Sequence, residues 1–215
     1  MNAKKIYEIH SYKFPNSVFI NENNIIELPS ICVYHKKVNG KDFLFISGDT
    51  QPGDEVSCHE LCDKLLELFK KNKGNEIITL GGIGLQNIPK NPKVFCTGTS
   101  KKIIKSYLLS GVNDDTYKFV GPIMGVTGIL LGLANKRKIE GVSLLTETFG
   151  HPNYLGFKGA KKLIGVLSKK FNFKMDLSKL DEEENKIEKH FSPKLNLKEL
   201  TGKEKNNEKD LTYIG

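Results

Sequence analysis

Short apolar runs alternate with stretches of helical spacing along most of this chain, and this alternation limits the fold more than any other feature of the sequence. Strands are predicted at residues 77–80, 94–97 and 141–146, and helices at residues 56–73, 100–111, 126–136, 154–171 and 175–190. Strands that alternate with helices favour an α/β fold. We expect a three-layer α/β/α sandwich around a mostly parallel mixed sheet.

The first part of the chain adds shorter strands. They are predicted at residues 5–12, 18–20, 31–37 and 42–47, with a turn at residues 21–24 and a further short strand at residues 117–120. Asn39-Gly40 separates two of these strands and is a strong hairpin signal. The run at residues 43–46 is continuously apolar, which predicts burial on both faces, as in the middle of a covered sheet.

From residue 192 onward the periodic pattern ends. Residues 192–210 are rich in Lys, Glu and Asn, and they predict a flexible, disordered tail after an α/β domain at residues 1–191. The chain turns apolar again at its end, in Leu211, Thr212, Tyr213, Ile214 and Gly215. An apolar end on a flexible tail is typical of a docking segment, so these five residues are predicted to bind a partner.

The net charge of +8 does not favour nucleic acid, because the lysines are spread along the chain and Arg137 is the single arginine. No apolar run approaches the roughly 18 residues that a membrane span needs. The N-terminal residues have no signal-peptide pattern, so a cytoplasmic location is expected.

The four cysteines are Cys32, Cys58, Cys62 and Cys96. Cys58 and Cys62 lie four residues apart on a predicted helix, which is the spacing of a buried face as well as of metal ligands. A zinc site usually needs a second pair of ligands, and none follows. We therefore expect buried thiols and no metal.

Glycines at the ends of predicted strands mark a possible pocket. Gly82 and Gly84 follow a strand, but Asn87 stands where a dinucleotide fingerprint needs glycine, so a tight turn is favoured and no cofactor is expected. Gly121 and Gly125 precede a helix, where close packing is favoured over an anion site.

Glu147 ends a strand and could form an acid/base pair with His151. A structural role is favoured over catalysis, because no nucleophile beside a base is evident. The possible pocket comprises Gly82, Gly121, Gly125 and Glu147.

The segment from residue 28 to residue 190 resembles the PAC2 family, which includes archaeal proteasome-assembly-chaperone homologues. The resemblance lies in the order and spacing of five segments, at residues 45–52, 78–82, 94–99, 125–134 and 143–148. It implies a fold similar to that of nucleoside phosphorylases, self-association, and a role in assembling 20S proteasome subunits.

Two departures from the family pattern stand out. Some family members dock through a hydrophobic residue, a tyrosine and any last residue, whereas Tyr213 here is third from the end. The usual first strand and Gly-rich loop of the family are also not evident at the start of this chain.

The sequence thus predicts a non-enzymatic, homo-oligomeric scaffold of the proteasome-assembly-chaperone type. Its expected partners are 20S subunits or a related archaeal assembly protein. The alternative is an enzyme of the phosphorylase, hydrolase or ligase type that uses the pocket at the carboxyl ends of the strands.

Overall fold

The computed structural model describes residues 2–108, 110–113, 121–151 and 154–191. The chain divides into two units, Met1–Asp176 and Leu177–Gly215. The second unit contains helix α5 (Ser178–Phe191), close to its predicted place. The strand predicted at residues 117–120 and the predicted tail lie outside the described residues, so both stay predictions. None of the described helices is long and apolar enough to cross a membrane.

The first sheet is an antiparallel meander with the strand order β1-β4-β5. Its strands are β1 (Lys4–Ile9), β4 (Ile31–Val38) and β5 (Lys41–Gly48). Asn39 and Gly40 connect β4 to β5 with φ angles of 49° and 78°. Both values are positive, as a two-residue hairpin turn that matches the twist of its strands requires. The predicted hairpin is therefore confirmed.

Strand β5 differs from its prediction. The apolar run at residues 43–46 was expected in the middle of a covered sheet, but β5 is an edge strand, and Phe45 and Ile46 are 40% and 44% exposed. The prediction was wrong because an apolar run shows only that its side chains are hydrophobic. It does not show whether other parts of the chain cover them.

The second sheet has the strand order β6-β8-β7. Its strands are β6 (Ile77–Leu85), β7 (Val94–Gly98) and β8 (Gly141–Phe149). Among the paired strands that the structure describes, β6 and β8 form the only parallel pair, so the expected mostly parallel sheet is wrong. The reason lies in the connections: a loop without a helix joins β6 to β7, and such a loop lets the chain reverse direction.

The glycines after residue 80 lie inside β6 and not in a turn. Gly81 pairs with Leu145 and Gly82 with Thr146 across the ladder to β8. A Cβ atom at Gly82 would lie 2.9 Å from the Thr148 methyl group. The predicted tight turn was wrong because these glycines make room for side chains of the neighbouring strand.

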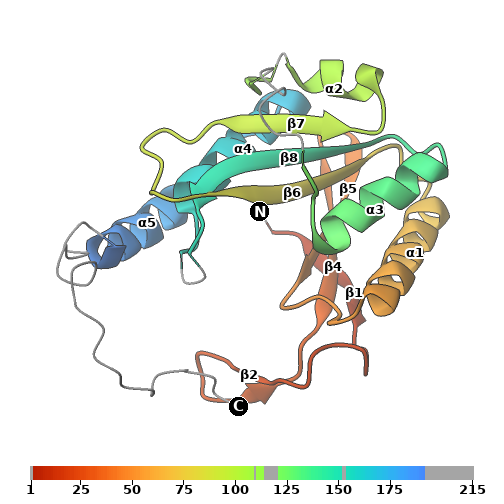
Figure 1. Ribbon diagram of the computed structural model, residues 1–215, viewed down its shortest axis with the longest axis horizontal. Coiled ribbons are helices and arrows are strands. Elements are labelled where there is room, and N and C mark those ends of the chain that lie inside the picture. Colours follow the sequence, from red (N-terminus) through yellow and green to blue (C-terminus); the bar gives the residue numbers. More distant parts are fainter. Residues whose placement is uncertain (1, 109, 114–120, 152–153, 192–215) are drawn as a thin grey trace. The chain divides into compact units, whose positions relative to one another are not determined.

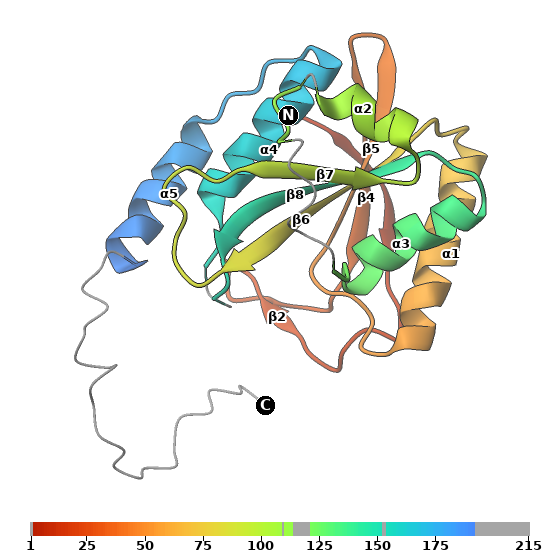
Figure 2. The ribbon, with the colours of Figure 1, turned by 45° about the horizontal axis from the view of Figure 1, so that its top comes forward.

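Helices cover both faces of the second sheet (Figures 1 and 2). Ile77 packs in the cluster formed by α1 and α3, whereas the next residue, Ile78, packs in the cluster formed by α2 and α4. Because neighbouring residues of a strand point to opposite faces, the two helix pairs lie on opposite sides. The helices are α1 (Glu55–Lys71), α2 (Lys101–Leu108), α3 (Gly125–Lys136) and α4 (Phe157–Phe171). The mixed α/β class with a layered core is confirmed.

Side-chain hydrogen bonds cap the first turns of α1 and α2. The Ser57 N–H donates to Asp54 Oδ1 at 2.9 Å at the start of α1, and the Ile103 N–H donates to Ser100 Oγ at 3.2 Å at the start of α2. Ser100, the first residue of the helix predicted at residues 100–111, therefore caps the start of α2.

Replacing Leu66 with alanine should lower the free energy of unfolding by about 2–5 kcal/mol, because its fully buried side chain packs between α1 and α3. Val56 lies on the same helix but is 68% exposed, so Val56→Ala should change stability by less than about 0.5 kcal/mol. Urea unfolding followed by circular dichroism measures both. Equal losses in the two variants would contradict the packing described here.

Candidate functional site

Gly82 and Glu147, two of the four predicted pocket residues, lie on adjacent strands. Gly82 pairs with Thr146 and Ile83 pairs with Glu147 along the β6–β8 ladder. The Lys93 backbone N–H donates to Glu147 Oε2 at 2.8 Å, and the Glu147 N–H donates to the Lys93 carbonyl at 3.0 Å. Glu147 therefore holds the chain at the start of β7, which is a structural use of this carboxylate.

Gly121 and Gly125, the other two pocket residues, precede or begin helix α3. Gly125 has a φ of 76°, and the Val126 N–H donates to Gln51 Oε1 at 3.0 Å. The Gln51 amide thus caps the helix N-terminus that we considered as an anion site. Further along α3, a Cβ at Gly128 would lie 1.9 Å from the Ile123 carbonyl oxygen, which supports close packing at that glycine.

His151 is placed by aromatic packing. Its ring stacks on Phe149 with 5.6 Å between the ring centroids, and Phe149 also meets Tyr154 edge to face at 5.7 Å. Glu147 and His151 therefore each have a structural contact, and a catalytic pairing between them stays the less favoured prediction.

Two cavities in the first unit differ from the predicted pocket in their lining. None of the four predicted pocket residues is in the lining of either cavity. The smaller measures about 180 Å³ and lies beside α2, with Glu76 and Glu140 in its lining. Tyr107 donates its hydroxyl to Glu76 at 2.6 Å, and Ser100 donates to Glu140 at 2.8 Å. The larger measures about 480 Å³ and lies between the start of β7 and helix α4. A pocket formed by Gly82, Gly121, Gly125 and Glu147 stays a prediction.

Three of the four thiols belong to the core. Cys58, Cys62 and Cys96 are buried, whereas Cys32 is half-buried. Burial raises the pKa of Cys62 to about 12 and the pKa of Cys96 to about 11, and it also raises the pKa of Cys58. The expectation of buried thiols at Cys58 and Cys62 is confirmed. Within the described residues no group of three or more His, Cys, Asp or Glu side chains is placed to hold a metal.

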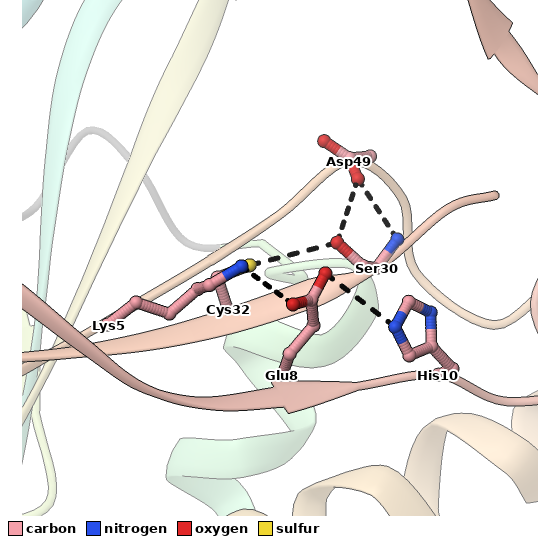
Figure 3. A network of polar contacts seen from close by, with 6 residues as sticks. All are labelled: Lys5, Glu8, His10, Ser30, Cys32 and Asp49. Carbon is pink, nitrogen blue, oxygen red and sulfur yellow. Dashed lines mark hydrogen bonds and ion pairs between the residues drawn. The ribbon is translucent and has the colours of Figure 1, made fainter. Parts of the chain in front are cut away.

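Cys32 lies in a polar network on strands β1 and β4 (Figure 3). Lys5 donates to Glu8 at 2.6 Å and holds the pKa of that carboxyl below its usual value. Asp49 accepts hydrogen bonds from the backbone N–H and the hydroxyl of Ser30, at 3.0 and 3.4 Å. The network joins the start of β4 to the end of β5, which is a structural role.

The site that sequence reasoning missed is an exposed apolar hairpin formed by β2 (Phe19–Ile20) and β3 (Ile26–Glu27). Five of its large apolar side chains are at least 43% exposed, and Ile20 reaches 70%. We call this set the apolar hairpin: Phe19, Ile20, Ile25, Ile26 and Leu28. A cluster of this kind on a protein surface marks a site of interaction. Its signal in the sequence was the pair of apolar dipeptides on either side of the turn predicted at residues 21–24.

Hydrogen bonds within the turn hold the apolar hairpin in shape. Asn21 Oδ1 accepts from the backbone N–H groups of Asn23 and Ile25 at 2.9 and 3.0 Å, and Asn21 Nδ2 donates to Glu27 at 2.7 Å. Asn24 takes the left-handed conformation with a φ of 58°. The exposed side chains are therefore displayed on an ordered turn, which reduces the entropy lost on binding.

The layered α/β fold and the exposed apolar hairpin together define the class of this protein: an α/β protein with an apolar surface suited to binding. Comparison with known protein families then gives the particular family. The chain belongs to the PAC2 family, whose family model matches residues 1–193. The resemblance inferred from the sequence is thus confirmed.

Among individual relatives, the chain is similar to PbaB of Pyrococcus furiosus, described as an archaeal proteasome activator. The TM-score is 0.79 at 29% identity, over 90% of this chain and 83% of that chain. Similarity to P. furiosus PbaA, an archaeal homolog of proteasome-assembly chaperone, gives a TM-score of 0.71 at 22% identity, over 88% of this chain and 75% of that one. The uncharacterized protein MJ1210 of Methanocaldococcus jannaschii is 26% identical, over 99% of this chain and 82% of its own length.

Iodoacetamide at pH 8 should modify Cys32 first in the folded protein. Cys62 and Cys96 remain almost entirely protonated at that pH because of their raised pKa values, and the thiolate is the reactive form. Mass spectrometry of timed samples should show a single rapid addition, and further additions only after unfolding in urea. The Cys32→Ser variant is the control and should lack the rapid addition. Rapid modification of Cys62 in native buffer would contradict the burial described here.

Proposed function

We propose that this protein is a non-enzymatic scaffold of the cytoplasm that forms a homo-oligomer and binds protein partners, in part through residues 211–215. Membership of the PAC2 family supports an assembly role, and similarity to an archaeal proteasome activator points to proteasome-related partners. The proposed partners are 20S subunits or a related archaeal assembly protein.

The observation that carries the proposal is the apolar hairpin. A two-stranded hairpin is at best marginally stable in water, yet this one is ordered with its apolar side chains exposed. Burying such side chains removes apolar surface from water and stabilises the hairpin together with whatever covers it. A second copy of the chain is the occupant that self-association would supply.

Strand β5 offers a second surface of the same kind. It is the edge of its sheet, and Phe45 and Ile46 are exposed on it. Unpaired edges with apolar side chains are ready templates for association with another chain. Oligomerisation would also present several C-terminal tails at once, so that weak docking of each tail could add up to firm binding.

The alternative, an enzyme acting at the carboxyl ends of the strands, has less support. The Glu147 carboxylate is engaged by the Lys93 backbone, and the N-terminus of α3 is capped by Gln51. An enzyme would need these groups for its substrate.

Replacing Ile26 with aspartate should weaken self-association at least about tenfold, because burying an isoleucine contributes about 1.5–3 kcal/mol and a buried aspartate adds a desolvation cost. Native mass spectrometry across a dilution series measures the oligomer. Val56→Asp changes an equally exposed apolar residue on α1 and should leave the oligomer intact. A monomeric wild-type protein, or equal losses in both variants, would refute the role of the hairpin.

Deleting residues 213–215 should weaken retention of the protein on immobilised 20S subunits, because the apolar end of the tail is the proposed docking segment. Deletion of residues 205–207 removes the same number of residues but keeps the apolar end, and it should leave retention unchanged. Surface plasmon resonance at micromolar protein measures both. Failure of the full-length chain to bind would exclude 20S subunits as partners.

A further inference from the structure

The larger cavity lies beside β7 and is built from three segments of the first unit. It is lined by residues before and at the start of β7, by the turn after α2, and by one face of α4. Its volume of about 480 Å³ falls within the range of roughly 300–1,000 Å³ that is typical of ligand sites. Val94, Val112 and Val166, which line it, are buried, so its floor belongs to the packed core.

Lysines dominate the charged lining. Lys93, Lys161, Lys162 and Lys169 all line the cavity, and none of the described residues in the lining carries a carboxylate. Three of these lysines lie on α4 and the fourth precedes β7, so the tertiary fold brings the fourth charge to the other three. Like charges held around one cavity repel one another, and a bound anion would relieve that repulsion.

Three of these lysines make no ion pair with any residue that the structure describes. Among the described residues, Lys93, Lys162 and Lys169 have no ion-pair partner, and the Glu147 carboxylate beside Lys93 meets its backbone N–H. The neighbouring Lys170 differs: its ammonium donates to the Ser106 carbonyl and hydroxyl at 2.9 and 2.8 Å. The lysine with a structural role is thus distinct from the lysines around the cavity.

Gly165 keeps the α4 side of the cavity open. It lies four residues from both Lys161 and Lys169, on the helix face that they share. A Cβ atom at Gly165 would have no heavy atom within 4 Å, so it faces open space. Glycine in the middle of a helix is destabilising relative to alanine, and no steric contact of the backbone requires it here.

The lining also defines the kind of anion. Its described residues include no arginine, which would favour planar bidentate carboxylate recognition, and no aromatic ring on which a base could stack. Lysine ammonium groups bind phosphate as point charges with freely rotating donors. We infer that this cavity binds a compact anion of two or more linked phosphate groups, supplied either as inorganic polyphosphate or by a nucleotide.

Isothermal titration calorimetry of the full chain with tripolyphosphate, at low ionic strength, tests the inference. The Lys162→Gln/Lys169→Gln variant should bind roughly tenfold or more weakly, because each lost charge removes a charge-assisted hydrogen bond. Lys70→Gln/Lys71→Gln removes the same charge from α1, away from the cavity, and should bind like the wild type. Equal weakening in both variants, or no binding to the wild type, would overturn the inference.

A second variant separates the cavity from diffuse attraction to a basic surface. Gly165→Leu keeps every lysine but fills the cavity, so it should abolish binding. Gly132→Leu is its matched control, because Gly132 is also a helical glycine whose Cβ would face open space, on α3. Thermal unfolding checks that both variants fold, and unchanged binding by a folded Gly165→Leu protein would place the anion elsewhere.

Two further ligands identify the anion. Citrate carries comparable charge on carboxylates and should bind at least tenfold more weakly than tripolyphosphate; equal affinity would overturn the assignment to phosphate. ATP that binds no more tightly than tripolyphosphate supports inorganic polyphosphate as the source, and tighter binding of ATP supports a nucleotide. The inference is independent of the proposed function, since the residues that carry it are different from the apolar hairpin and from residues 211–215.

Discussion

Strand β8 is paired along both edges and covered on both faces, and the rest of the first unit is arranged around it. Its whole length runs parallel to β6, and its first half pairs antiparallel with β7. Val142 and Leu144 are fully buried against α2 and α4, while Ser143, on the other face, is 1% exposed. Because buried backbone groups must find hydrogen-bond partners, a strand in this position fixes the places of its neighbours. Through Glu147 it also positions the start of β7, which forms one wall of the lysine-lined cavity.

The buried apolar side chains are unevenly distributed. The two core clusters combine the second sheet with four helices, whereas the first sheet and the apolar hairpin leave many large apolar side chains in water. Such an arrangement makes physical sense when folding and association are coupled, because the surface left exposed by one chain is the surface that another can bury. In the proposed scaffold, the helical layers keep each subunit folded and the N-terminal strands supply the contacts.

The local chemistry of the sequence predicted the helices and the β4–β5 hairpin well. Ser100, Asn39 and Gly40 act through contacts with residues close by in the chain, so their effects can be read from a short window. The predictions for β5 and for Gly82 failed for the opposite reason. Whether an apolar run is covered, or a glycine lies in a turn or a strand, depends on segments distant in sequence.

Composition, periodicity and motif order carry enough information to predict the α/β class, the PAC2 membership and the thiol character of Cys58 and Cys62. Three features depend on contacts between distant segments and could not be predicted in this way: the direction of β7, the exposure of the apolar hairpin, and the position of Lys93 beside the lysines of α4. Along the chain, helices and strands separate Lys93 from the lysines of α4, and the sequence pattern of these lysines is that of an ordinary solvated surface. They form one charged cavity because packing on the central strand brings α4 beside the start of β7.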